Sequence, residues 1–274
     1  MKIMTLNTHS YIEAESERKL ALLINMLMRI RPDVIALQEV NQTKASPSAK
    51  VNKEIALQSF GIELKADNYG LRIAEKLLKN GIRYNLVWAG IKDSYDSYEE
   101  GLCFLTKAPV TRAEAFVISK VDSDSDWRKR MALGIEIGYE WFYNVHMGRW
   151  DDEKEPFYNQ WIRLKQRVNY MSPAWLMGDF NAPSDRRSEG YDCIISSGWH
   201  DTFMLAENKD SGFTVTEKID GWHDAPYPFE NKRIDYIFTD IKKKIFSSYT
   251  AFNGTDEEKI SDHHAVVVTY EREM

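Results

Sequence analysis

The stretch Trp175-Leu176-Met177-Gly178-Asp179-Phe180-Asn181 combines a short apolar run with two oxygen-bearing side chains. Residues 175–177 predict a buried strand, and this strand leads directly into Asp179 and Asn181. In layered α/β proteins, ligands bind in the crevice at the carboxyl ends of strands. Asp179 and Asn181 are therefore candidates for a functional site.

The same succession of an apolar strand and a polar residue occurs elsewhere in the 274-residue chain. Predicted strands end at or just before Asn7, Glu39 and His146. Two further groups of polar residues occur near the C-terminus. Asp235 lies inside a predicted strand, and a second predicted strand directly follows Asp262, His263 and His264. Strand ends that share one crevice would bring these side chains together.

The order of predicted elements favours a mixed-sheet α/β fold. Helices are expected over 17–30, 71–79 and 154–171. Strands are expected over 2–7, 33–37, 83–89, 102–107, 110–119, 131–138, 141–146, 175–177, 233–239, 245–251 and 265–270. Because strands mostly follow strands, two packed sheets fit better than a doubly wound parallel sheet. Without repeats or linker-like segments, a single domain over residues 1–274 is expected.

Composition narrows the class of protein. The chain carries 36 Lys and Arg against 42 Asp and Glu, a net charge of -6, whereas gripping a nucleic-acid backbone needs a basic surface. Two cysteines are too few for a disulfide scaffold and fit a reducing compartment. The N-terminus lacks an apolar core of signal-peptide length, and the longest apolar stretch, 20–28, is far below the ~20 residues of a membrane span. We therefore expect a cytoplasmic protein with no membrane contact and no nucleic-acid partner.

The candidate residues suit chemistry on a phosphate ester. Four of them offer the hard oxygen ligands that Mg²⁺ or Mn²⁺ prefers, namely Asn7, Glu39, Asp179 and Asp262. His146 and His263 could donate hydrogen bonds to phosphoryl oxygens, and Asp179 could orient or deprotonate a water. Together they predict metal-assisted hydrolysis of a phosphate ester.

Each candidate also has a structural interpretation when taken alone. An asparagine that follows a first strand, such as Asn7, is commonly a turn residue. Glu39 at a strand end is commonly a solvated cap, and Asp235 could be half of a structural salt bridge. The number, type and order of the candidates distinguish the functional interpretation from these alternatives.

Six motifs, taken in order, resemble the endonuclease/exonuclease/phosphatase superfamily. The motifs are Leu6-Asn7-Thr8-His9, Gln38-Glu39-Val40, Asn144-Val145-His146, Gly178-Asp179-Phe180-Asn181, Arg233-Ile234-Asp235-Tyr236 and Ser261-Asp262-His263. The resemblance runs from residue 3 to residue 270. It implies a DNase I-like fold, a four-layered α/β sandwich with two central mixed β-sheets and the site at one edge.

The resemblance also implies roles for the residues that would bind metal and activate water. Glu39 would be the principal metal carboxylate, with Asn7 beside it, and Asp262 would complete the metal and water network. Asp179 would activate the attacking water. Asn181 would hold water or phosphate.

The remaining implied roles concern the phosphate. His263 would contact the phosphoryl group, oriented by Asp235. His146 would be a second phosphate contact, with its ring held by Glu100. One cation of the run Arg128-Lys129-Arg130 would face the phosphate, and Arg130 matches best, with the other two as alternatives. His9 and His264 receive no catalytic role from the resemblance.

Aromatic residues in the predicted loops indicate the class of substrate. Trp150, Trp222 and Tyr227 lie in loops that also contain acidic residues, and an aromatic face packs well on the C–H face of a pyranose ring. With 8 Trp and 14 Tyr in the chain, packing is the alternative. These loops, together with the acidic composition and Gly178–Ser184, resemble the maltose 6'-phosphate phosphatases of Gram-positive bacteria.

That resemblance implies a Mg²⁺-dependent phosphomonoesterase acting on a small phosphorylated sugar in the cytoplasm. A DNA or RNA phosphodiesterase of the same superfamily is the alternative. A non-catalytic binding protein on this fold is a third hypothesis, against which the intact set of polar residues speaks. The sequence leaves the oligomeric state open.

Overall fold

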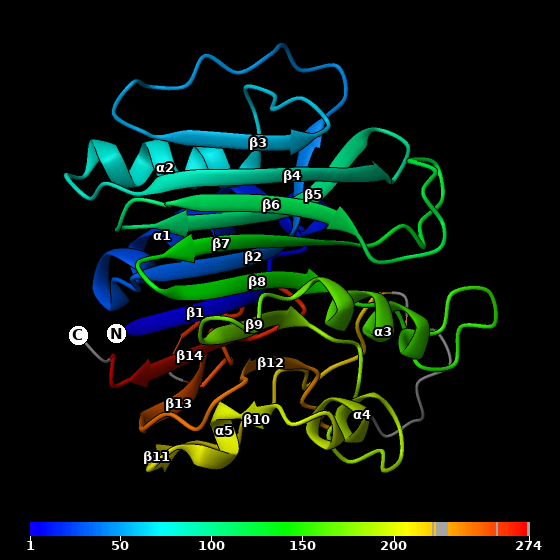
Figure 1. Cartoon of the computed structure of the whole chain (residues 1–274). Coiled ribbons are helices and arrows are strands. Elements are labelled where there is room, and N and C mark those ends of the chain that lie inside the picture. The colour runs from blue at the N-terminus through cyan, green and yellow to red at the C-terminus, as the bar shows by residue number, and fades with distance from the viewer. Residues whose placement is uncertain (221, 223–229, 256, 273–274) are drawn as a thin grey trace.

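The computed structural model describes residues 1–220, 222, 230–255 and 257–272 (Figure 1). Within these residues the strands form an eight-stranded and a six-stranded sheet. The first has the order β11-β13-β14-β1-β2-β5-β4-β3, and its strands are β1 (Lys2–Asn7), β2 (Val34–Thr43), β3 (Leu57–Gly61), β4 (Asn85–Ser94), β5 (Tyr98–Thr106), β11 (Asn208–Lys209), β13 (Ile245–Ala251) and β14 (Ala265–Tyr270). The second has the order β10-β12-β9-β8-β7-β6, and its strands are β6 (Arg112–Val117), β7 (Met131–Ile137), β8 (Glu140–His146), β9 (Ala174–Asp179), β10 (His200–Asp201) and β12 (Asp235–Thr239).

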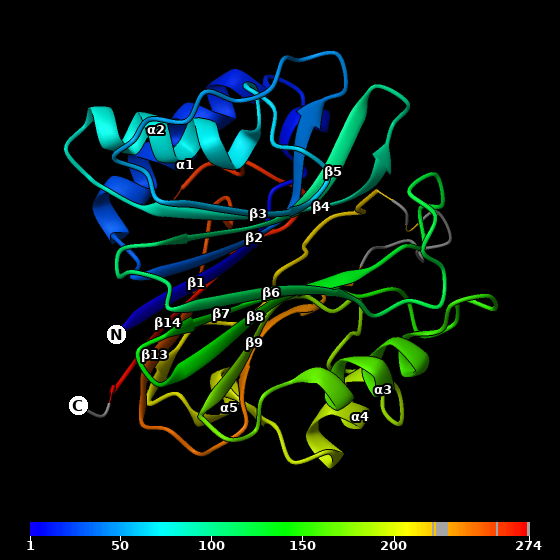
Figure 2. The ribbon, with the colours of Figure 1, turned by 45° about the horizontal axis from the view of Figure 1, so that its top comes forward.

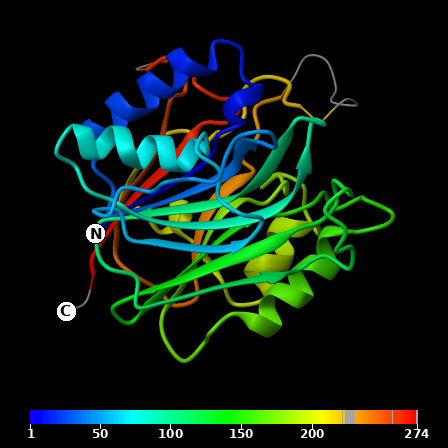
Figure 3. The ribbon, with the colours of Figure 1, turned by 90° about the horizontal axis from the view of Figure 1, so that it is seen from above.

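Helices cover the outer face of each sheet, which completes four layers (Figure 3). The helices α1 (Ser16–Ile30) and α2 (Tyr69–Lys79) share one apolar cluster with the eight-stranded sheet. On the six-stranded sheet, the helices are α3 (Phe157–Arg167) and α4 (Gly190–Ser196). Short helical segments also occur at η1 (Ser10–Ile12) and α5 (Thr202–Leu205). Both sheets mix parallel and antiparallel pairs, so the predicted four-layered α/β sandwich is confirmed.

The packing explains why some strands are apolar throughout. Along β2, Ile35 and Leu37 pack toward the helices, whereas Val34 and Ala36 pack between the two sheets. A strand that is buried on both faces has no face exposed to solvent, so its sequence is a continuous run of apolar residues. Figure 2 shows the two sheets lying face to face between the pairs of helices.

Some elements differ from the predicted bounds. The helix expected over 154–171 is observed as α3, because Pro156 precedes its first turn and the backbone leaves the helix at Val168 with ψ 135°. The strands β4 and β5 extend beyond the predicted strands 83–89 and 102–107 and form a hairpin. This extension carries Lys92 and Glu100 to the edge where the other candidate residues lie.

The candidate residues meet at one edge of the two sheets. β1 runs parallel to β2, so its last residue, Asn7, lies beside Gln38 and close to Glu39 within β2; β8 runs parallel to β9, and His146 and Asp179 end these strands side by side. β12 and β14 run antiparallel to these strands and begin at the same edge. His146, Asp179 and Asp235 are direct cross-strand partners along β8, β9 and β12. Among the described residues, no helix has the length and apolar character needed to cross a membrane.

Candidate active site

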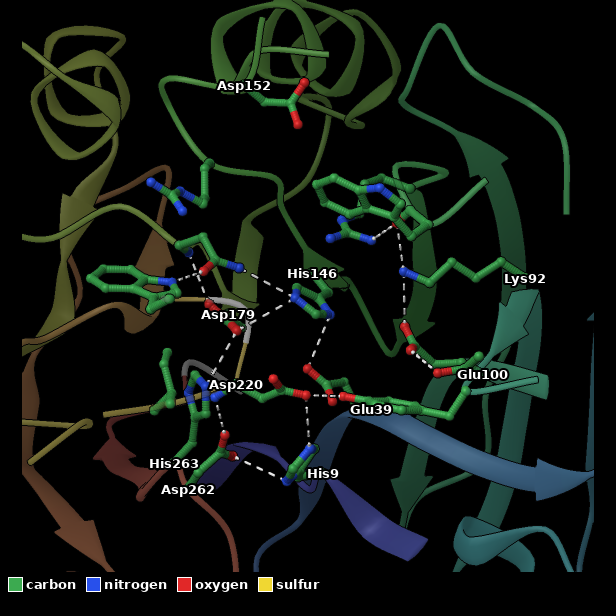
Figure 4. A pocket seen from close by; sticks show the side chains of 18 of the residues that line it. His9, Glu39, Lys92, Glu100, His146, Asp152, Asp179, Asp220, Asp262 and His263 are labelled. Atoms are coloured by element: carbon green, nitrogen blue, oxygen red, sulfur yellow. Dashed lines mark hydrogen bonds and ion pairs between the residues drawn. The ribbon is translucent and has the colours of Figure 1, made fainter. Parts of the chain in front are cut away.

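A cavity of about 680 Å³ opens at this edge (Figure 4). The predicted residues that line it are Glu39, Glu100, Arg130, His146, Asp179, Asn181, Trp222, Asp262 and His263. Asn7 and Asp235 lie directly behind this lining and bond to it. The volume is in the range of roughly 300–1,000 Å³ that small-molecule sites occupy.

Asp179 lies at the centre of the cavity wall. Its Oδ2 is 3.6 Å from Nε2 of His146 and 3.8 Å from Nε2 of His263. The strand can place it there only because Gly178 precedes it: Gly178 has φ +145°, and a Cβ would lie 1.9 Å from the carbonyl oxygen of Val145. Burial raises the pKa of Asp179 to about 7, although the nearby His263 acts against the shift. A carboxylate with this pKa can exchange a proton near neutral pH.

His263 is held as a cation. Its Nδ1 lies 2.9 Å from Oδ2 of Asp235, and both side chains are buried. Burial by itself would lower the pKa of His263, but the carboxylates of Asp235 and Asp179 outweigh it and hold the pKa well above its usual range. Because Nδ1 faces Asp235, Nε2 is the nitrogen left to meet a group in the cavity.

His146 has the opposite charge state. Burial lowers its pKa well below the usual value, and the positive charges of Arg130 and Lys92 lower it further. Its Nε2 lies 3.3 Å from Nδ2 of Asn181, which also donates to the carbonyl of Met147. The ring nitrogen Nδ1 has no hydrogen-bond partner among the described residues and lies 3.9 Å from Oε1 of Glu39.

Glu100 lies in the cavity wall but does not hold the ring of His146. Within the described part of the chain, its recorded partners are Lys92, with 3.3 Å between Nζ and Oε1, and the hydroxyl of Ser94. The strand register explains the difference, because a shift after Gly90 aligns Lys92 with Glu100 across β4 and β5. The ring-holding contact expected from the sequence is therefore replaced by an ion pair.

Asn7 connects two carboxylates. Its Nδ2 donates to Oε1 of Glu39 at 2.8 Å and to Oδ2 of Asp179 at 3.1 Å, while its Oδ1 accepts the backbone N–H of His9. The amide oxygen, which the sequence assigned to a metal, therefore faces away from these carboxylates. Glu39 reaches this position through a φ of 49° at an irregularity in the pairing of β2 with β5.

The donor set suits a hard divalent cation. Burial raises the pKa of Glu39, and the negative charges of Glu100 and Asp262 raise it further, so a cation would relieve this repulsion. Among the described residues, two groups have possible ligand atoms within 4.8 Å of one another, and these are Asp179-Asp235-His263 and His9-Glu13-Asp262. Glu39 belongs to neither group, so the predicted metal residues are spread along the cavity wall.

Of the three neighbouring cations, only Arg130 lines the cavity in the described structure. Arg128 pairs with Asp126 and with the lining residue Asp152, whereas Lys129 pairs with Asp122 and Asp124 outside the cavity. The Nη1 of Arg130 donates to the carbonyl of Trp127 at 2.9 Å, and its Nε has no partner among the described residues. These contacts favour Arg130 as the residue that faces the phosphate.

The three aromatic residues predicted to contact a sugar differ in where they lie. Trp222 lines the cavity, and its Nε1 donates to Oδ1 of Asn181 at 3.1 Å. Trp150 does not line the cavity; it packs against Phe157 and Tyr158 at the start of α3, so its expected sugar contact is not supported. Tyr227 lies outside the described residues.

Several lining residues have little or no signal in the sequence. His9 follows β1 directly, and its Nδ1 lies 2.8 Å from Oε1 of Glu13 and 3.8 Å from Oδ1 of Asp262. Burial acts against it, but these carboxylates raise the pKa of His9 to about 9. The others are Lys92, Asp93, Ser94, Tyr95, Trp127, Arg149, Asp151, Asp152, Ile219 and Asp220. They come from loops and a hairpin whose relative placement no local pattern reveals.

Comparisons with known proteins agree with this architecture. The endonuclease/exonuclease/phosphatase family model matches residues 4–263. A solved member of that family from Leptotrichia buccalis is 29% identical, with a TM-score of 0.87 over 99% of this chain and 100% of that one. None of the curated proteins compared with the chain matches it.

More distant solved structures share the fold. A mannosyl-6-phosphatase from Bacteroides thetaiotaomicron is 17% identical, with a TM-score of 0.67 over 99% of this chain and 100% of that one. A 3' phosphatase from Neisseria, bound to a product DNA hairpin, is 16% identical, with a TM-score of 0.61 over 99% and 100%. The family match spans most of the sequence, and acidic and histidine residues from the matched range line the cavity. The chain therefore belongs to the endonuclease/exonuclease/phosphatase family of hydrolases.

Proposed function

We propose that this protein is a Mg²⁺-dependent phosphomonoesterase that acts on a small phosphorylated sugar in the cytoplasm, with maltose 6'-phosphate as a candidate substrate. One observation carries the proposal: a cavity of about 680 Å³ holds buried carboxylates, a cationic histidine and two buried cations, Lys92 and Arg130. This is the set of groups that hydrolysis of a phosphate ester uses.

The residues divide the work of hydrolysis. Asp179 accepts a proton from the attacking water, which Asn181 holds in place. As the bond between phosphorus and the ester oxygen breaks, His263 stabilises the negative charge on a phosphoryl oxygen. A divalent ion bound by Glu39 and Asp262, Mg²⁺ or alternatively Mn²⁺, would polarise the phosphoryl group.

The shape and charge of the cavity favour a small substrate over a polymer. The hydroxyl of Tyr95 donates to the carboxylate of Asp220, which ties the β4–β5 hairpin to the segment before Trp222. Asp93, Asp151 and Asp152 add negative charge to the lining, where a nucleic-acid backbone would need cations. No observation favours the nuclease alternative over the phosphatase.

The sugar would lie near Trp222. The guanidinium of Arg149 lies 6.0 Å from the centre of this ring, and Asp151 and Asp152 belong to the same cavity wall. Carboxylates and a guanidinium can bind hydroxyl groups while the ring packs on the C–H face of the sugar. The distant mannosyl-6-phosphatase supports the proposal only in that its fold carries this type of reaction.

A phosphate-release screen tests the proposal. The purified protein is assayed with added Mg²⁺ or Mn²⁺ on phosphorylated mono- and disaccharides, nucleotides and supercoiled plasmid. We expect phosphate release from a sugar phosphate, complete loss of activity with EDTA and recovery when the metal is returned. Nicking of the plasmid with steep salt dependence and no release from any sugar phosphate would establish the phosphodiesterase instead.

A further inference from the structure

We propose that Lys92, acting beside Arg130, selects phosphate groups that carry two negative charges and so makes the site prefer monoesters over diesters. The inference rests on the proposed function and names the charge of the substrate group that the site recognises. Lys92 would be a specificity-determining residue, placed on the side of the cavity away from Asp262 and His263 (Figure 4).

The fold holds Lys92 in one place. Lys92 and Glu100 are direct partners across β4 and β5, aligned by the register shift after Gly90. They are 5% and 7% exposed, which is rare for either residue type unless it is paired. The Nζ of Lys92 lies 3.3 Å from Oε1 of Glu100 and still faces the cavity.

Lys92 and Arg130 share one hydrogen-bond acceptor. The carbonyl oxygen of Trp127 accepts from Nζ of Lys92 at 2.9 Å and from Nη1 of Arg130 at 2.9 Å. Like charges are thereby held close together, and the carboxylate of Glu100 pairs with Lys92. Burial and the charge of Arg130 lower the pKa of Lys92 to about 8, so an anion placed between the two cations would be stabilised.

Hydrogen-bond donors in the cavity wall remain for a ligand. The Nε of Arg130 is buried and has no partner among the described residues, and the same holds for Nδ1 of His146. Buried polar groups without partners are uncommon in folded proteins and point to a missing ligand. Both residues line the cavity together with Lys92. A phosphoryl group could accept hydrogen bonds from all three side chains.

The charge balance then gives the selectivity. At neutral pH a phosphate monoester carries close to two negative charges, because its second pKa is about 6, whereas a diester carries one. Lys92, Arg130 and Glu100 together carry one net positive charge on their side of the cavity, apart from His263 and Asp262. The second negative charge of a monoester would interact with this local positive charge, and a diester lacks it.

The test compares two substrates with the same leaving group. Wild type, Lys92→Met and Lys92→Arg are assayed on p-nitrophenyl phosphate and bis(p-nitrophenyl) phosphate at saturating Mg²⁺. We expect Lys92→Met to lower kcat/KM for the monoester about 10- to 100-fold, the effect of losing a charge-assisted hydrogen bond, and to change the diester less than about threefold. Lys92→Arg should retain most of the preference. Lys129→Met is the matched control, because Lys129 is similarly buried but pairs with Asp122 and Asp124 outside the cavity.

Two further measurements keep the outcomes distinct. The double variant Lys92→Met/Glu100→Gln removes the carboxylate that the single change leaves unpaired, so it serves where Lys92→Met fails to fold. Calorimetric titration with inorganic phosphate should show weaker binding to the Lys92 variants by a similar factor, independent of turnover. A wild type that prefers the diester overturns the proposed function. If the wild type prefers the monoester, but Lys92→Met changes neither the ratio of the two kcat/KM values nor the affinity for phosphate, only the inference about Lys92 is overturned.

Discussion

The two histidines beside Asp179 lie in regions of opposite character. His263 sits among carboxylates contributed by β9 and β12, and these hold its pKa well above the usual value. Burial lowers the pKa of His146, and the cations Arg130 and Lys92 lower it further. Both rings lie within 4 Å of the same carboxylate oxygen, at 3.8 and 3.6 Å. The charge state of each histidine is thus decided by the groups behind it.

The difference gives each region its own task. The region around His263 offers a cation and a proton acceptor, which suits the attack of water and the charge that develops on phosphorus. The region around His146 offers a neutral ring and fixed cations, which suits binding of the phosphate before reaction. Loss of the shared carboxylate Asp179, of the carboxylate behind His263, or of a hydrogen bond between the two regions should therefore have different effects.

Removal of the shared carboxylate should have the largest effect. Asp179→Asn keeps the shape of the side chain but loses the proton acceptor, so we expect kcat to fall by about 10³-fold or more. Phosphate release under single-turnover conditions measures the chemical step. A melting temperature close to wild type would show that the fold persists. Turnover near the wild-type rate would exclude Asp179 as the base.

Loss of the support behind His263 should have a smaller effect, with a pH signature. Asp235→Asn removes the negative charge that opposes the effect of burial, so the pKa of His263 falls from its raised value. The ring then loses its proton at lower pH, and activity should decline earlier as pH rises, with kcat lower by about 10- to 100-fold at neutral pH. The profile of kcat/KM from about pH 5 to about pH 9 measures this shift.

The control for this profile is Asp240→Asn, since Asp240 accepts the backbone N–H of Ala174 and does not line the cavity. It should leave the profile unchanged. An Asp235→Asn profile that coincides with wild type on the alkaline side would contradict the charged state assigned to His263.

The smallest effect is expected at the border between the regions. Trp222→Phe keeps an aromatic ring but loses the N–H that bonds Oδ1 of Asn181, so Asn181 is less firmly oriented toward His146. We expect kcat to fall about three- to tenfold, with a smaller change in KM. Trp150→Phe, outside the cavity, should change neither. If Trp222→Phe altered KM alone, Trp222 would act only as a surface for the sugar.

Much of the candidate site could be predicted because its residues follow apolar strands. Asn7, His146 and Asp179 each end a strand whose apolar pattern is local in the sequence, and Glu39 directly follows the apolar part of β2. The same patterns led to the mixed sheets that the structure shows. Trp150 was misassigned, because an aromatic residue in a loop near the site carries no local sign of whether it faces the cavity or packs on α3.

The α/β sandwich and the set of polar side chains at one edge of its sheets can be predicted from the sequence, since the period of apolar residues is a local property of the chain. The pairing and the charge of these side chains depend on the folded chain. The partner of Glu100 depends on a register shift between β4 and β5, and the bond between Trp222 and Asn181 joins residues far apart in sequence. The opposite pKa shifts of His146 and His263 depend on burial and on neighbours from separate strands, and such distances exist only once the chain has folded.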